Sequence, residues 1–403
     1  MPTLVPDRKE GCRVLIVDIV LCVILVIALI AGIQRGLLAS LGVLLGLTAG
    51  ALAAFWLMPV VNDAWPWQEW RPVIVVATGV ALLIAGAAIG GAIGAVLRRG
   101  VDRIRLKWVD RALGGVASVI VAALALSLVG SSVAATGTPF LSSALASSRV
   151  LGLIDQVTPT PVAAGMAQLR ATVLDQAIPQ LGALLDLDVQ PTAPPVALDD
   201  PQLAEAAASV ARVSGVAYAC GRSSTGTGFV IAPDRIVTNA HVVAGVTTPI
   251  VELPGRSARE GTIVYFDPIV DLAVIAVTDL DAAVIPVVDT LAPGTPGVVQ
   301  GYPFGGPFTM IGAEVLSVGT VPVPDIYSGA ASLREVYALA ATVQPGNSGG
   351  PLLTADGDAA GVVFARAEDD PDRGYAMTTA ELAPVVAQAG ALSAAVDSGR
   401  CTT

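Results

Sequence analysis

The sequence predicts a protein in two parts, an N-terminal all-α four-helix transmembrane bundle and a C-terminal all-β domain. Composition is the first reason: 54% of the 403 residues are hydrophobic and 14% are charged, which is too apolar for a wholly soluble protein. Distribution is the second, because residues 14–134 form nearly continuous apolar runs and the later chain does not. The third is the pattern after residue 215, where short apolar strands alternate with Gly, Pro and Asp turns, as in a β-barrel or sandwich.

We therefore divide the chain into a transmembrane domain at 1–135, a partly helical, proline-rich connector at 136–201 and a globular domain at 202–403. Four apolar runs can each cross the roughly 30 Å of a hydrocarbon core as helices of about 20 residues. They are about 14–33, 37–61, 72–97 and 109–134. The first run follows charged residues, as a signal peptide does. It lacks a clear small-residue cleavage site and more runs follow it, so we expect it to be retained.

Basic residues concentrate between the third and fourth runs, at 98–111. The positive-inside rule places this loop in the cytoplasm, so the chain after about residue 135 would be extracytoplasmic. The N-terminus would then be outside as well, and Arg8, Lys9 and Arg13 argue mildly against that. We expect a multi-pass protein of the cell membrane, with the lipid bilayer as a partner and a periplasmic globular domain.

Small and charged residues mark two of the apolar runs. Three glycines repeat every four residues in the third run, namely Gly86, Gly90 and Gly94. Such a face permits close helix contact, either within the bundle, which we favour, or in self-association of two copies. Asp18 is an ionisable group in the first run, with a functional or a structural role. The four-run layout, with Gly32 and Gly36 ending the first run, resembles the colicin V production protein family over about 14–135.

Prolines punctuate the connector after two segments of helical spacing, 140–153 and 162–178. This density predicts a semi-rigid spacer that holds the globular domain away from the membrane. A plain linker is the simpler interpretation, and a cleavage site that releases the domain is the alternative. Asp200 before Pro201 fits a helix cap and first position, which predicts a short helix at 201–212.

Charge and residue usage exclude several classes of partner. The formal net charge is −11, and the acidic excess falls on residues 202–403, which contain no lysine. Such a domain is a poor partner for nucleic acid. One histidine and no C-x-x-C leave no Cys/His metal cluster, so we expect neither a metal nor another cofactor. A transporter or channel finds little support, because few charges lie inside the apolar runs.

Three short stretches of the globular domain carry the residue types of a nucleophilic hydrolase. They are Thr238-Asn-Ala-His241, Asp271-Leu-Ala-Val and Gly346-Asn-Ser348-Gly-Gly. A serine hydroxyl needs a base to take its proton, a neutral imidazole does this near pH 7, and a buried carboxylate fixes the imidazole tautomer. Glycines near the serine let backbone N–H groups face a developing oxyanion. His241 is the only histidine, so the base has no competitor.

The order of these residues separates the hydrolase folds. Ser348 also fits the G-x-S-x-G elbow of α/β-hydrolases, but in that fold the histidine follows the serine, whereas His241 precedes it. His, Asp, Ser is the chymotrypsin order. With Gly226-Thr-Gly-Phe and Gly301-Tyr-Pro added, residues 202–403 resemble trypsin-like serine proteases of the bacterial HtrA/Deg branch.

This resemblance implies a chymotrypsin-like, all-β double six-stranded barrel. His241 and Asp271 of the first barrel and Ser348 of the second would form the catalytic triad, and the N–H groups of Gly346 and Ser348 the oxyanion hole. Asp267 is the rival for the orienting acid. It precedes a proline and lies further from the Leu-Ala-Val strand, so Asp271 is preferred.

Family position also places Thr342 near the floor of the primary substrate pocket and 362–366, with Phe364, along one wall. Neither offers an acid, so we expect small or apolar P1 residues. Asn347 stands where animal trypsins have the Asp that pairs with a freed N-terminus, so that activation route is not expected. We also expect no PDZ domain, because the residues after Ser348 suffice only to finish the barrel.

Cys220 and Cys401 lie near the two ends of the globular domain and, outside the cytoplasm, are expected to form a disulfide. It would close a loop of about 180 residues, worth roughly 5 kcal/mol in the chain-entropy model. Two free thiols are the alternative. A bond here would also couple redox state to activity.

A colicin V production-like anchor joined to such a protease resembles the actinobacterial membrane serine proteases linked to acid resistance in mycobacteria. The expected function is a membrane-anchored, extracytoplasmic serine endopeptidase that hydrolyses envelope proteins through an acyl-enzyme, in acid or oxidative stress resistance. The alternative is a catalytically silent membrane scaffold or sensor whose protease-like domain only binds.

Overall fold

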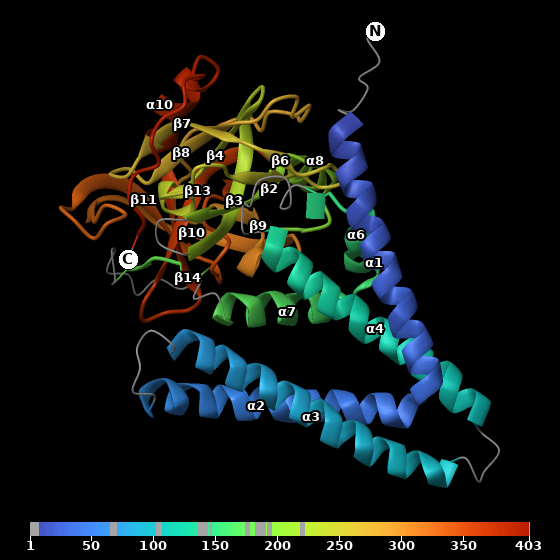
Figure 1. Ribbon diagram of the computed structural model, residues 1–403. Helices are drawn as coiled ribbons and strands as arrows, with labels where there is room; N and C mark the ends of the chain where they lie inside the picture. The colour runs from blue at the N-terminus through green and yellow to red at the C-terminus, as the bar shows by residue number, and fades with distance from the viewer. Residues whose placement is uncertain are drawn as a thin grey trace. The chain divides into compact units, whose positions relative to one another are not determined.

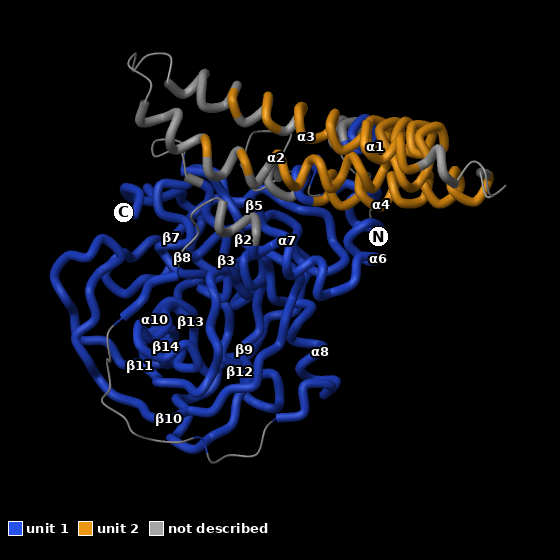
Figure 2. Tube along the Cα trace, turned by 90° about the horizontal axis from the view of Figure 1, so that it is seen from below, with its two compact units in different colours: residues 1–17, 128–403 blue, residues 18–127 orange. Residues whose placement is uncertain are grey.

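The computed structural model describes residues 8–402, apart from 65–70, 102–106, 135–143, 146, 174–177, 182–190, 192–195 and 218–221. The chain separates into two compact units, coloured differently in Figure 2. One is Asp18–Ser127, and the other combines Met1–Val17 with Leu128–Thr403. Part of the predicted cytoplasmic loop and Cys220 lie outside the described residues.

Four long helices form the N-terminal part of the chain, and each contains one of the predicted apolar runs. They are α1 (Arg8–Arg35), α2 (Leu37–Ala64), α3 (Arg71–Val101) and α4 (Lys107–Ala134). Among the described residues, Val14–Arg35 and Trp108–Gly130 are long and apolar enough to cross a membrane. The apolar stretches of α2 and α3 are shorter, Leu37–Gly50 and Ile84–Leu97, so a bundle with four spans stays a prediction.

Glycines bring α2 and α3 into close contact. A Cβ atom added to Gly90 would collide with the carbonyl oxygen of Gly42, and one added to Gly86 would collide with that of Gly46. Only a residue without a side chain permits this approach of two backbones. The glycine face of the third run therefore packs on α2 of the same chain, the interpretation favoured above. Self-association through this face stays a prediction.

A carboxylate on α4 joins this helix to the start of α2. The backbone N–H of Leu38 donates to Asp110 Oδ1 at 3.3 Å, and Asp110 is 7% exposed. The first N–H groups of a helix have no partner within the helix, and a carboxylate there also complements the helix dipole. The Ser118 hydroxyl donates to that of Ser40 at 3.2 Å, a second contact between α4 and α2. Sequence reasoning had not singled out Asp110.

The described part of the connector contains two helices and a short strand, and a third, capped helix begins at its end. The elements are α6 (Arg149–Val157), α7 (Thr160–Val173), β1 (Gln180–Leu181) and α8 (Pro201–Ala207). Asp200 caps α8, accepting from the Gln202 N–H at 2.8 Å, with Pro201 at the first helical position as predicted. The predicted end of this helix at residue 212 is wrong. The Ala-rich segment ends at Ala207 because the β-branched residues from Val210 onward join a strand.

The strands of the described residues form two seven-stranded sheets, and Figure 1 draws these strands as arrows. The first has the order β6-β5-β2-β3-β4-β8-β7 and the second β1-β13-β12-β9-β10-β11-β14. The strands of the first are β2 (Val210–Ala217), β3 (Arg222–Ala232), β4 (Arg235–Thr238), β5 (Ile250–Glu252), β6 (Arg259–Glu260), β7 (Thr262–Asp267) and β8 (Leu272–Ala276). Those of the second, besides β1, are β9 (Pro296–Gly301), β10 (Thr309–Val323), β11 (Ser332–Ala340), β12 (Pro351–Leu353), β13 (Ala359–Ala367) and β14 (Arg373–Thr378).

Pairing of β13 with β14 closes six strands of the second sheet into a ring, with β1 added beside β13. The first sheet pairs in an open order among the described residues, so the expected double six-stranded barrel stays a prediction. Each sheet encloses apolar residues of its own, for example Ile236 in the first and Tyr337 in the second.

A third apolar cluster contains residues of both sheets and of α10 (Thr379–Ala389), such as Phe229, Val336 and Leu382. Successive side chains of a strand point to opposite faces, and β11 accordingly sends Val336 and Ala338 to this shared cluster and Tyr337 and Leu339 to the interior of the second sheet. The shared cluster fixes the two sheets against each other, and the candidate site lies where loops of both sheets meet.

Candidate active site

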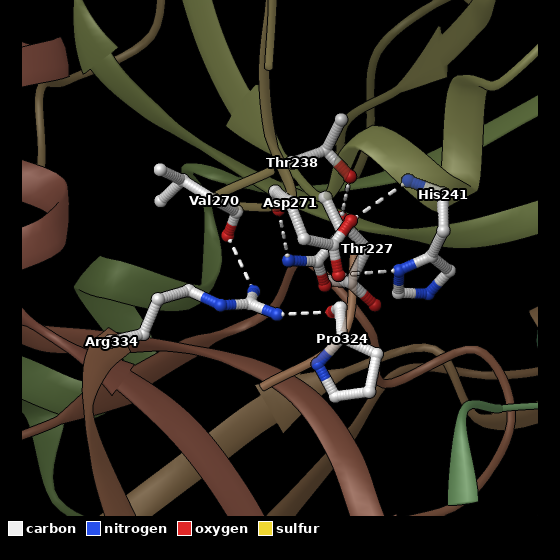
Figure 3. A network of polar contacts seen from close by, with 8 residues as sticks. Thr227, Thr238, His241, Val270, Asp271, Pro324 and Arg334 are labelled. Atoms are coloured by element: carbon white, nitrogen blue, oxygen red, sulfur yellow. Dashed lines mark hydrogen bonds and ion pairs between the residues drawn. The ribbon is translucent and has the colours of Figure 1, made fainter. Parts of the chain in front are cut away.

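His241 and Asp271 come together because β4 and β8 are neighbouring strands. The pairing of Thr238 with Ala273 places the residues just beyond these positions side by side. His241 lies on the one-turn helix α9 (Ala240–Val243), and Asp271 directly precedes β8. The Asp271 carboxylate accepts from His241 twice, with Oδ2 2.8 Å from the ring Nδ1 and Oδ1 2.9 Å from the backbone nitrogen. Both side chains are nearly buried, at 11% and 5% exposure, and Figure 3 shows the Asp271 carboxylate facing the His241 ring.

The backbone of Asp271 is held in an uncommon conformation, with a φ angle of +65°. Its N–H donates to Asp267 O at 3.0 Å, and its carbonyl accepts from Asn239 Nδ2 at 2.9 Å. Left-handed φ values in residues other than glycine persist only where the surroundings enforce them. The carboxylate therefore faces the imidazole because of several contacts to its own backbone.

Asp267, the rival acid, has another place in the structure. Its Oδ1 accepts from the backbone N–H groups of Ile269 and Val270 at 2.8 and 3.0 Å. This is the side-chain turn that Asp commonly forms between two strands. Asp267 shapes the turn from β7 to β8, and Asp271 contacts the imidazole.

Ser348 lies on the loop between β11 and β12 and is 3% exposed. Its carbonyl accepts from the Thr227 N–H at 2.8 Å, which ties the loop to β3 of the first sheet. The buried Ser348 hydroxyl makes no hydrogen bond to any of the described residues. Hydrogen bonds of catalytic groups are often incomplete without substrate, so this geometry is compatible with a nucleophile that pairs with His241 on binding.

The loop before Ser348 is fixed by a buried threonine and by the turn η4 (Pro303–Gly305). Thr227 Oγ1 donates to Gly346 O at 2.6 Å, and Phe304 N donates to Pro345 O at 2.5 Å. In a trans peptide, C=O and N–H point in opposite directions, so the Gly346 N–H points away from Phe304. Gly346 has a φ angle of +95°, and a Cβ atom there would collide with Tyr302 O, so glycine is required. Such a fixed N–H is what an oxyanion hole needs.

The two residues predicted for the substrate pocket lie in different settings. Thr342 is exposed and donates its hydroxyl to Asp372 Oδ1 at 2.7 Å, so an acid that the sequence pattern did not place there neighbours the predicted pocket floor. Phe364 is 2% exposed, and its ring packs in the cluster shared by both sheets. Their role in substrate binding stays a prediction.

Arg334 is a part of the site that the sequence did not reveal. It lies on β11, is 2% exposed, and donates to Val270 O at 2.9 Å and Pro324 O at 2.6 Å (Figure 3). Burial lowers the pKa of Arg334, and the nearby Asp271 opposes this shift. No local pattern distinguishes a single arginine in a strand, and only the alternation of β11 indicates that it points inward.

Cys401 lies near the C-terminus, while Cys22 is a free, exposed cysteine. A Cβ atom at Gly245 would lie 2.9 Å from Cys401 Sγ and 3.2 Å from Ala217 Cβ. Cys401 is thus close to the end of β2, and β2 ends a few residues before Cys220 in the sequence.

Comparisons with known proteins agree with both parts of the chain. A trypsin-like peptidase domain matches residues 226–362, and a colicin V production protein matches residues 17–159. The chain is 34% identical over 402 residues to the serine protease Rv3671c of Mycobacterium tuberculosis, covering 96% of this chain and 98% of that protein. It is 37% identical over 163 residues to the putative serine protease HhoB of Synechocystis, covering 38% of this chain and 37% of that protein.

A crystal structure of the active form of the Rv3671c protease of M. tuberculosis covers 54% of this chain and 100% of its own, at 35% identity and a TM-score of 0.49. The family identification rests on the sequence identity, which extends over nearly the whole chain. The protein belongs to the family of trypsin-like serine endopeptidases that includes Rv3671c, with a colicin V production-type N-terminal region.

Proposed function

We propose that the protein is a membrane-anchored endopeptidase working outside the cytoplasm, with Ser348 as nucleophile, His241 as general base and Asp271 as the orienting acid. The observation that carries the assignment is the pair of contacts from Asp271 to the ring and the backbone of His241. The carboxylate leaves Nε2 of the imidazole as the acceptor, because Nδ1 donates to Asp271.

The reaction follows from these positions. His241 Nε2 takes the proton of the Ser348 hydroxyl as its oxygen attacks the scissile carbonyl carbon. The resulting oxyanion is bound by the N–H groups of Gly346 and Ser348, which replace water as hydrogen-bond donors. The imidazolium then gives its proton to the leaving amine, and the acyl-enzyme forms. Water, deprotonated by His241, releases the acyl group and restores Ser348.

The membrane topology and the redox environment are part of the proposal. Two apolar helices support anchoring, and the basic segment near 98–111 supports a cytoplasmic loop that leaves the protease domain outside. The closeness of Cys401 to Ala217 supports its pairing with Cys220, which an oxidising compartment would permit. Envelope proteins would be the substrates and acid or oxidative stress the setting, as the resemblance implies. Thr342 and Phe364 would contribute to the primary pocket.

A fluorophosphonate probe applied to the full chain in detergent tests the enzyme assignment. We expect covalent labelling of the wild type, none of Ser348→Ala, and normal labelling of Ser398→Ala, in which the lost hydroxyl bonds only to Val246 O. Undiminished labelling of Ser348→Ala would refute Ser348 as the nucleophile. Absence of labelling in a folded wild type would instead favour the silent scaffold or sensor.

A further inference from the structure

Arg334 is a buried cation next to the acid of the proposed triad. It is 2% exposed, far less than is usual for arginine, which is seldom fully buried without a carboxylate partner. Among the described residues its guanidinium forms no ion pair, and it instead donates to two backbone carbonyls, Val270 O and Pro324 O. The guanidinium carbon lies 5.6 Å from the centroid of the Phe364 ring. A group this costly to bury calls for a reason beyond packing.

The contact to Val270 is where the cation meets the proposed active site. Val270 immediately precedes Asp271, so Arg334 fixes the peptide group that joins these two residues. Asp267 O fixes the N–H of that same peptide group at 3.0 Å, and Asn239 fixes the carbonyl on the other side of Asp271. Arg334 is the one of these anchors that comes from the second sheet. It thereby links the strand β11 to the left-handed backbone of Asp271.

Charge acts in the same place. Four carboxylates act electrostatically on Arg334. They are Asp271 before β8, Glu381 of α10, Asp267 of β7 and Asp325 in the segment after β10. Arginine keeps its positive charge in proteins at any ordinary pH. Opposite charge nearby favours the ionised form of a carboxyl group, and low-dielectric surroundings strengthen the effect.

We propose that Arg334 is a positioning residue of the protease. It holds the Val270–Asp271 peptide group, and with it the left-handed backbone of Asp271, and its charge supports the ionised Asp271 carboxylate opposite His241. The inference rests on the proposed function. It differs from a purely structural role, in which Arg334 would only join the two sheets and could be replaced without any effect on the chemistry.

Kinetics of three variants in the full chain separate these roles. Arg334→Met keeps the stem and removes both the donors and the charge. Arg334→Lys keeps the charge but has no fork to serve two carbonyls. Arg235→Met is the matched control, because Arg235 is a part-buried arginine that donates to Leu392 O and Asp234 O, away from Asp271.

We expect kcat to fall about 10- to 100-fold in Arg334→Met, as for other losses of groups that orient catalytic residues, with KM changed less than about twofold. The pH profile of kcat/KM should also differ from that of the wild type, because the carboxylate opposite the imidazole has lost a nearby cation. Arg334→Lys should restore the pH profile and only part of kcat, and Arg235→Met should resemble the wild type. A folded Arg334→Met protein with wild-type kcat and pH profile would overturn the proposal, whatever its melting temperature.

A second measurement does not depend on proteolysis. His241 is the sole histidine, so ¹⁵N-histidine labelling gives one imidazole spectrum from the full chain in detergent. We expect the wild type to show a strongly hydrogen-bonded, downfield Nδ1 proton that is lost or shifted upfield in Arg334→Met and retained in Arg235→Met. An unchanged Nδ1 resonance in Arg334→Met overturns the positioning role. If the wild type shows this resonance without labelling by the fluorophosphonate, the endopeptidase assignment fails, and the resonance alone decides the role of Arg334.

Discussion

Replacing Thr227 by valine tests how the first sheet supports the oxyanion loop. Thr227 is fully buried, and its hydroxyl donates to Gly346 O at 2.6 Å and accepts from Tyr302 N at 3.0 Å. Valine has the same shape and fills the same space, so the change removes two hydrogen bonds without leaving a cavity. It strands one buried carbonyl and one buried N–H, at about 1–3 kcal/mol each.

Both stability and catalysis should respond to this loss. We expect the free energy of unfolding to fall by about 2–6 kcal/mol if the loop keeps its place, and less if the loop moves to find new partners. In the second case the Gly346 N–H shifts, and kcat should fall by up to about 10²–10³, the cost of losing one oxyanion donor.

Thermal denaturation and kcat on a peptide substrate check Thr227→Val against two controls. Thr227→Ser keeps the hydroxyl and should stay near wild type. Thr225→Val makes the same exchange on the same strand, where the hydroxyl donates only a 3.4 Å bond to Val213 O. If Thr227→Val matches Thr225→Val in both measurements, the reasoning about the oxyanion loop is wrong.

Three further results are expected. Asp271→Asn should lower kcat by about 10⁴, because the imidazole then adopts the wrong tautomer. Asp267→Asn should lower kcat far less, because an amide oxygen can still accept the hydrogen bonds of the turn. Equal losses of kcat in steady-state kinetics would contradict the assignment of Asp271. Burial raises the pKa of Tyr302 from 10.0 to about 12, so the stability tied to its proton is present below pH 10 and lost as pH rises through 12. Urea unfolding should show a smaller loss of stability across this pH window in Tyr302→Phe than in the wild type. Equal slopes of stability against pH in the two proteins would contradict this expectation. Gly90→Leu should separate α3 from α2 at Gly42 and speed limited proteolysis in detergent, and an unchanged digestion pattern would speak against the close helix pair.

The sequence predicts the parts whose signal is local. Apolar runs longer than a globular helix mark the four long helices, and His241 beyond a strand end follows from turn chemistry and chain order. The preference for Asp271 over Asp267 rests on position relative to a strand and stays a prediction, which is supported by the contact of Asp271 with His241 and by the turn that Asp267 forms. In contrast, the helix predicted after Pro201 is shorter in the structure, because the pairing of β2 with β3 decides where the helix ends.

The rest depends on contacts between distant segments. Arg334 is 63 positions from Asp271 in the sequence, and no pattern in the residues around it indicates a buried cation. The acid beside Thr342 is likewise supplied by Asp372, from the turn before β14. The support of the oxyanion loop by Phe304 requires a residue with a φ angle of +56°, which no pattern of residue types foretells.

The short strand β1 ties the segment before the protease domain to the second sheet. Before the connector reaches β2 it pairs in parallel with β13, through Arg366 N to Pro179 O at 3.1 Å and Glu368 N to Leu181 O at 3.0 Å, and it buries Ile178 beside the second sheet. A pull along the axis of β1 would load both hydrogen bonds in shear at once, whereas a pull across it would break them one after the other. Such a pull would reach the protease domain first at β13, the strand that carries Phe364, and not at the sheet that bears His241.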